Sequence, residues 1–197
     1  MRRVLLISLF ALLMVSLAAA EVQTWNIDPN HSAAQFSVRH MGISTVRGAF
    51  TKVKGAVAYD SADPSKSAID ATIDATSVDT RVEARDKDLR SPNFFDVDKF
   101  PTITFKSKSV SADGSGKLKV TGDLTIKGVT KEVVLDVDGP SSPIKAQNGG
   151  ERMGASATTK INRKDFGVNG AAAAVGDEIT ITLDVELVKP APAPAGK

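Results

Sequence analysis

The 197-residue chain contains no cysteine, only two histidines, one tryptophan and one tyrosine. Without cysteine it has no disulfide, thiol nucleophile, iron–sulfur cluster or cysteine-ligated zinc site, and two histidines are too few for a histidine-rich metal site. The P-loop, the glycine-rich dinucleotide fingerprint, the H-E-x-x-H motif and the G-x-S-x-G motif are also absent. We therefore expect no catalytic residue, no cofactor and no metal ion.

The N-terminus holds the single long apolar run. Arg2 and Arg3 precede the run from Val4 to Leu17, and three alanines, residues 18–20, follow it. This order predicts a Sec-type signal peptide over residues 1–20, because the run is shorter than the about 20 residues of a membrane-spanning helix. We expect a periplasmic protein, with secretion as the alternative.

Charge excludes one class of partner. The net charge of +2 is carried by the two arginines of the predicted signal peptide, so the mature chain is formally neutral. Nucleic-acid binding needs a concentrated basic surface and is not expected.

Alternation of apolar and polar residues dominates the mature chain and predicts antiparallel strands with one face in a core. It is clearest over residues 69–76, 117–127 and 179–187, and further strands are expected at about 23–28, 33–40, 44–59, 102–111, 130–138 and 153–162. Near Thr51 the apolar parity changes, which predicts a β-bulge. Eight or more short strands favour an all-β barrel or sandwich, and alternation does not choose between them.

A helical pattern interrupts the strands. Thr80 and Glu83 have the spacing of a capping box, which predicts a short helix near residues 81–90. Phe94, Phe95 and Phe100 follow, and we expect this segment to form an apolar plug that closes one end of a barrel, or a lid beside a cavity mouth. The chain is thus divided into a signal peptide (1–20), one barrel domain (21–188) and a disordered Pro/Ala tail (189–197).

The histidines offer little chemistry. His31 follows Pro29-Asn30 and is expected in a turn. His40 shares the parity of Phe36 and Val38, so it should point inward. It is interpreted as a hydrogen-bonded core residue, an anchor for a ligand head group, or the general base of an enzyme.

Eight short segments carry a family resemblance. They read WNIDPNHS (25–32), FSVRHMG (36–42), VRGAF (46–50), TSVDT (76–80), RDKDLRSPNFFD (85–96), FPTITF (100–105), GDLTIKGVT (122–130) and INRKDFG (161–167). In this order they resemble the YceI-like family of polyisoprenoid-binding, lipocalin-like periplasmic proteins. The resemblance covers residues 22 to 188, nearly the whole mature chain.

The resemblance implies an extended eight-stranded antiparallel barrel, lipocalin-like in form, with an internal tunnel for an isoprenoid chain. It implies a carrier or sequestering protein for a polyisoprenoid or another long-chain lipid. A homodimer and transient membrane contact are also expected. Two alternatives are a lipid-modifying enzyme that uses His40 and a structural or adhesive β-sandwich module.

Inward parity and the aromatic segment predict the residues that would bind a lipid tail. They are Phe36, Val38, Ala71, Ile73, Phe94, Phe95, Phe105, Val120, Leu124, Ile181 and Leu183. Polar residues near a mouth would bind the head group, and arginine suits a phosphate. The predicted head-group residues are Arg39, His40, Arg47, Asn162, Arg163 and Asp165.

Overall fold

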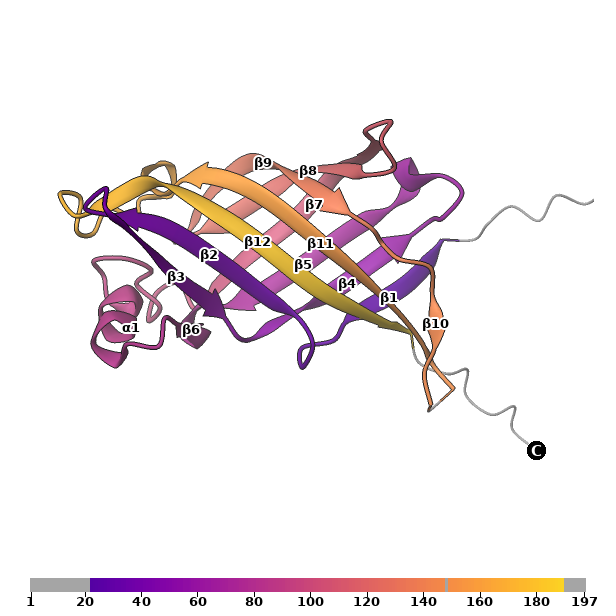
Figure 1. The fold of residues 1–197 in the computed structure, drawn as a ribbon, viewed down its shortest axis with the longest axis horizontal. Helices are drawn as coiled ribbons and strands as arrows, with labels where there is room; N and C mark the ends of the chain where they lie inside the picture. Colours follow the sequence, from indigo (N-terminus) through magenta and orange to yellow (C-terminus); the bar gives the residue numbers. More distant parts are fainter. Residues whose placement is uncertain (1–21, 148, 190–197) are drawn as a thin grey trace, which may run out of the picture.

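The alternating segments fold into long antiparallel strands that close on themselves (Figure 1). The structure is a computed structural model that describes residues 22–147 and 149–189. The predicted signal peptide, and all of the predicted tail except Lys189, lie outside the described residues. Within the described ranges, no helix is long and apolar enough to cross a membrane.

Eight strands form the ring of the barrel. They are β1 (Gln23–Ile27), β4 (Val53–Tyr59), β5 (Ala68–Asp74), β7 (Thr102–Ala112), β8 (Leu118–Ile126), β9 (Val129–Asp138), β11 (Glu151–Asn162) and β12 (Val175–Lys189). They are adjacent in the order β1-β4-β5-β7-β8-β9-β11-β12, and β12 pairs with β1 to close the ring. The predicted all-β barrel is confirmed, and the sandwich alternative is wrong.

Two further strands lengthen one side of the wall. β2 (Ala33–His40) pairs with β12 beyond the end of β1, and β3 (Ser44–Phe50) pairs with β2. The short strands β6 (Val78–Asp79) and β10 (Ile144–Lys145) lie beside β3 and β11. The remaining elements are the helix α1 (Glu83–Arg90) and three short 3-10 turns, η1 (Pro64–Lys66), η2 (Ala75–Ser77) and η3 (Arg163–Phe166).

The predicted bulge near Thr51 is wrong. Residues 44–59 form two strands, β3 beside β2 and β4 between β1 and β5. The main-chain nitrogen of Lys52 donates to the hydroxyl of Ser77 at 3.2 Å, outside any strand ladder. The parity change therefore marks a point where the chain leaves one part of the wall and enters another, with Phe50 and Val53 both buried.

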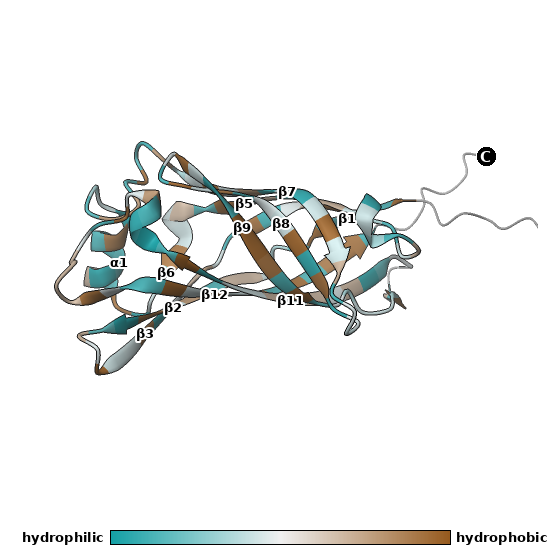
Figure 2. Ribbon diagram, turned by 90° about the horizontal axis from the view of Figure 1, so that it is seen from above, coloured by the Kyte–Doolittle hydropathy of each residue, from teal (hydrophilic) through white to brown (hydrophobic). Residues whose placement is uncertain are grey.

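Apolar residues point into the barrel and polar residues point out. Figure 2 shows hydrophobic and hydrophilic residues alternating along the strands. Trp25, Val78, Phe166 and Leu187 are the largest fully buried side chains. This arrangement follows from the period of two, because each strand has one face toward the interior.

Helix α1 begins differently from the prediction. Its N-cap is Val82, and no side chain caps it. Thr80 instead bonds the buried Asp86: its main-chain nitrogen donates to Asp86 Oδ1 at 2.9 Å, and its hydroxyl donates to the same oxygen. Arg85 also donates to the Thr80 hydroxyl oxygen and carbonyl, at 2.8 and 2.9 Å. Asp86, not Glu83, therefore receives the bonds of Thr80, and the capping box is wrong.

The break between β1 and β2 is closed by hydrogen bonds to Glu186 of β12. The main-chain nitrogen of Asp28 donates to the Glu186 carbonyl at 2.8 Å, and the Glu186 nitrogen donates to the Ser32 hydroxyl at 3.0 Å. Both main-chain groups of Glu186 are therefore hydrogen-bonded on this side, although neither β1 nor β2 pairs with this residue.

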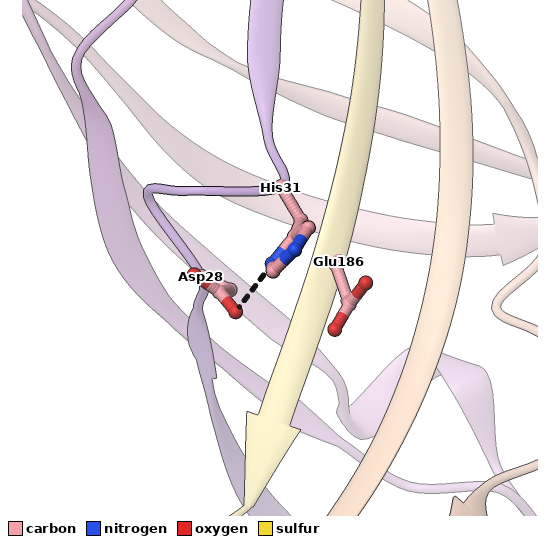
Figure 3. Close-up of side chains that lie close together, drawn as sticks. All are labelled: Asp28, His31 and Glu186. Carbon is pink, nitrogen blue, oxygen red and sulfur yellow. Dashed lines mark hydrogen bonds and ion pairs between the residues drawn. The ribbon is translucent and has the colours of Figure 1, made fainter.

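Side chains strengthen this junction, which we call the β1–β2 clamp (Asp28, His31, Arg152 and Glu186). Figure 3 shows His31 turned toward Asp28, with Glu186 beside them. Asp28 Oδ2 lies 3.0 Å from His31 Nδ1 and 3.1 Å from the Arg152 guanidinium, which also contacts the Glu186 carboxylate. Hydrogen bonds from His31, from the main-chain nitrogen of Asn30 and from Arg152 hold the pKa of Asp28 below its usual range.

The first prediction concerns the start of α1. Replacing Asp86→Ala leaves the nitrogen and hydroxyl of Thr80 without their acceptor, and we expect a loss of roughly 2–3 kcal/mol in the free energy of unfolding. Glu83→Ala, the matched control, should change it by less than about 0.5 kcal/mol. Urea denaturation measures both values, and equal losses would contradict the assignment.

The second prediction concerns acid stability. Since the pKa of Asp28 is lower in the folded than in the unfolded chain, its stabilising contribution is present above about pH 4 and is lost as the pH falls through the lowered pKa. Asp28→Asn should therefore cost about 1–2 kcal/mol near pH 7, and this difference should shrink steadily below about pH 4. Urea unfolding across this pH range tests the change, with Asp98→Asn, at an exposed aspartate, as the matched control variant. A deficit that stays constant to low pH would be the opposite result.

Candidate functional site

The barrel encloses an apolar cavity of about 270 Å³. All eight strands of the ring contribute lining residues. Its lining includes Leu118 at the start of β8 and Pro140 just after β9, as well as Phe94 and Val168, which follow α1 and η3. Figure 1 shows α1 at one end of the barrel. The cavity thus follows the long axis of the molecule.

The structure brings all of the predicted tail-binding residues to this cavity. Phe36, Val38, Ala71, Ile73, Phe94, Phe95, Phe105, Val120, Leu124, Ile181 and Leu183 line it. Their contact with a ligand stays a prediction. The prediction omitted others, such as Val133, Leu135 and Val185. The alternation that revealed the first set also marks these residues, since they share the inward parity of β9 and β12.

Glycines keep two phenylalanine rings close to the wall. A Cβ atom added at Gly48 would lie 2.5 Å from Phe36 Cζ, and one added at Gly122 would lie 2.5 Å from Phe105 Cζ. Each ring therefore lies over the main chain of the neighbouring strand, where a side chain would otherwise stand. The rings cover the wall while leaving space along the axis.

Aromatic residues cross the cavity at the α1 end. Phe50 lies edge-on to Phe95 with ring centres 5.4 Å apart, and it lies 5.8 Å from Phe36. Phe94 packs against the loop after η3 so closely that a Cβ atom at Gly170 would meet its ring at 2.6 Å. Leu89 of α1 lines the same end of the cavity. Phe94 and Phe95 of the predicted plug thus lie there, whereas Phe100 does not line the cavity and its ring lies against Gly128.

Arg163 is the one charged side chain among the described residues that line the cavity. It is 4% exposed. Its guanidinium donates to the carbonyls of Gly176, Val168, Gly170 and Val175 at 2.8–2.9 Å. Arg163 therefore holds the loop between η3 and β12, and the geometry does not support its predicted head-group role.

The other predicted head-group residues do not line the cavity. Arg39 is exposed, and it donates to the Thr45 hydroxyl at 2.8 Å and to the Gly42 carbonyl at 2.6 Å. Asn162 accepts from the main-chain nitrogen of Lys164 at the start of η3, and Arg47 and Asp165 are exposed. The structure thus does not gather these residues into one polar pocket.

His40 is half-buried at the end of β2, opposite Ser44 and Val175, and it does not line the cavity. The inward direction predicted for it motivated the enzyme alternative. The structure therefore gives that alternative no support.

The β1–β2 clamp contains a set of groups that could in principle hold a metal ion. Ligand atoms of Asp28, His31 and Glu186 lie within 4.8 Å of one another. However, the Arg152 guanidinium contacts both carboxylates and supplies the positive charge that an ion would bring. The geometry favours an internal ion-pair network. Sequence patterns could not reveal it, because Glu186 is 155 residues from His31 along the chain.

Comparison with known proteins agrees with this architecture. The model of the YceI-like domain matches residues 25–187. Protein YceI of Shigella flexneri is 36% identical over 197 aligned residues, covering 96% of this chain and 99% of the relative. The crystal structure of the Campylobacter jejuni YceI protein superposes with a TM-score of 0.67 at 34% identity, covering 75% of this chain and 86% of that one.

A more distant structure shares the fold alone. A polyisoprenoid-binding domain from Saccharophagus degradans superposes with a TM-score of 0.63 at 15% identity, covering 87% of this chain and 100% of that domain. The match to the domain model and the 36% identity extend over most of this chain. The chain therefore belongs to the YceI-like family.

Proposed function

We propose that this protein binds a polyisoprenoid, or a similar long-chain lipid, inside its barrel and transports or sequesters it in the periplasm. The observation that carries the proposal is the cavity along the barrel axis, whose only charged lining residue among those described is engaged by main-chain carbonyls. The similarity in fold to the polyisoprenoid-binding domain from Saccharophagus degradans supports the same ligand class.

Physical chemistry makes a hydrocarbon the fitting occupant. Each methylene-sized group removed from water contributes about 0.8 kcal/mol, so a chain of several isoprene units gains strongly from an apolar sleeve. A charged ligand would lose its hydration without finding partners on these walls. Apolar contacts are not directional, so the cavity discriminates between ligands by the length and the cross-section of the hydrocarbon chain.

The proposed location rests on the N-terminal pattern of a basic region, an apolar run and alanines in residues 1–20. A lipid of the cell envelope that must cross an aqueous compartment needs a carrier with such a cavity. Carriage and sequestration both follow from the same binding step, and they differ in whether the lipid is later released.

The third prediction is that the protein carries lipid when it is isolated. The exported protein, purified without detergent, is extracted with organic solvent, and the extract is analysed by mass spectrometry. We expect a prenyl chain or another long-chain lipid in near-stoichiometric amount. A protein that contains no lipid and binds neither geranylgeraniol nor palmitic acid would refute the proposed function.

The fourth prediction concerns cavity volume. Ala71→Leu and Ala155→Leu place larger side chains on inward-facing positions of β5 and β11. Each should lower the affinity for geranylgeraniol about tenfold, because the added methyl groups occupy space worth about 0.8 kcal/mol per ligand methylene.

The matched control is Thr158→Leu, an exposed position on β11. Its affinity should equal that of the wild type. Fluorescence displacement or calorimetry measures the affinities, and thermal unfolding verifies that each variant is folded. Affinity unchanged in both filled variants would show that the ligand lies elsewhere.

A further inference from the structure

Two large apolar side chains are exposed to solvent at the turn between β2 and β3. Met41 is 64% exposed and Ile43 is 80% exposed. The loop that follows η3 lies beside this turn, since the Met41 nitrogen donates to the Ala174 carbonyl at 2.7 Å. Residues 171–173 of that loop are exposed alanines. We call Met41, Ile43 and residues 171–173 the apolar tip; Figure 1 shows it at the α1 end of the barrel.

The conformation of Met41 is unusual for its side chain. Met41 has φ +50° and Gly42 has φ +71°, and the Ile43 nitrogen donates to the His40 carbonyl at 3.1 Å. His40 pairs with Ser44, so the hairpin loop consists of residues 41–43, and the positive φ values at its first two positions are of the kind that favours Asn, Asp or Gly. A methionine there is disfavoured by its Cβ atom, and its exposed side chain adds little packing to the fold.

The two chain segments that carry the apolar tip contain charges of one sign only. Residues 33–50 contain Arg39 and Arg47 and no acidic residue, and residues 168–176 contain no charged residue at all. Arg39 pairs with Thr45, and Arg47 pairs with Ser37. The two exposed arginines are therefore diagonal neighbours on the outward face of the hairpin.

Acidic residues near the start of β12 do not cancel this charge. Asp177 lies 2.9 Å from Lys164 and 3.7 Å from Arg163, and Glu178 lies 2.9 Å from Lys160. The outward face of the hairpin thus combines exposed apolar groups with two arginines that form no ion pair within the part of the chain that the structure describes. This combination is typical of surfaces that insert into the interfacial region of anionic membranes.

We propose that the apolar tip docks this end of the barrel onto the surface of a bilayer that contains anionic phospholipids. The proposal rests on the proposed lipid-binding function and names the surface from which the ligand is taken or to which it is delivered. The same loop that carries residues 171–173 lines the cavity through Val168 and Val175 and is held by Arg163. Docking therefore brings the membrane next to the α1 end of the cavity.

The test is co-sedimentation of the exported protein with vesicles. We expect binding to vesicles of phosphatidylethanolamine and phosphatidylglycerol, weaker binding to vesicles of phosphatidylcholine alone, and a decrease at high salt. Ile43→Asp should reduce binding about tenfold, because an inserted aliphatic side chain is replaced by an acid. Arg47→Gln should reduce both the binding and its dependence on salt.

Two further variants separate docking from a general effect on the fold. Ile144 is 66% exposed on β10, at the opposite end of the barrel (Figure 1), so Ile144→Asp is the matched control and should bind vesicles like the wild type. Met41→Asn should weaken vesicle binding while leaving the melting temperature unchanged or higher, because asparagine tolerates a positive φ.

The outcomes that overturn the proposal are distinct from those that overturn the proposed function. Absence of vesicle binding by the wild type, or an equal loss in Ile144→Asp, refutes docking even when extracted protein contains lipid. A dimer that Ile43→Asp converts to a monomer, with vesicle binding unchanged, shows that the tip contacts a second copy and also refutes it. Conversely, protein that docks through the tip but never contains or binds lipid refutes the proposed function alone.

Discussion

The pairing of β12 with three partners is the constraint on which the structure depends. One edge of β12 pairs with β11, and the other pairs first with β2 and then with β1. This pairing closes the sheet, so the inward apolar faces are sealed from water without a second layer to cover them. A closed ring of this size does not bring opposite walls into full contact, and the result is a cavity along the axis.

Polar groups stabilise the wall and the ends of this barrel, and its interior is lined by apolar side chains. The β1–β2 clamp satisfies the main chain where β12 changes partners, and Arg163 ties the loop that forms one end of the cavity. The charged groups of the clamp and Arg163 are each balanced where they lie, by an opposite charge or by carbonyls. The apolar lining is therefore free to receive hydrocarbon, which is the basis of the proposed function.

The α1 end combines the features that a lipid would meet first. Phe94 and Phe95 cross the cavity there, the loop held by Arg163 forms its margin, and the apolar tip projects beside it. The rings of Phe50 and Phe95 pack edge to edge at this end, so the proposed lipid exchange would pass beside them. The two proposals thus assign membrane docking and ligand exchange to the same end of the molecule.

Local pattern determined what depends on neighbouring residues alone. Alternation in residues 69–76, 117–127 and 179–187 identified strands and their inward faces. Because side-chain direction in a strand has a period of two, it also placed residues such as Ile73, Leu124 and Ile181 on the cavity wall. The short helix after Thr80 was also foreseen from helix-forming residues, although its start was not, because Thr80 binds Asp86 through tertiary packing.

Tertiary structure alone decided the rest. Strand alternation is the same in a barrel and a sandwich, so only the pairing of β12 with β1 chose the barrel, although the family resemblance pointed to it. The change in apolar parity near Thr51 is the same for a β-bulge and for a chain that moves to new strand partners, so the sequence could not distinguish the two. The contact of Arg152 with Asp28 and Glu186 and the position of the apolar tip join residues far apart in sequence, and a local pattern carries no information about such contacts. The carbonyls that bind Arg163 are 5 to 13 residues away, but they lie in an irregular loop and at the start of β12, where no periodic pattern indicates which way a carbonyl points.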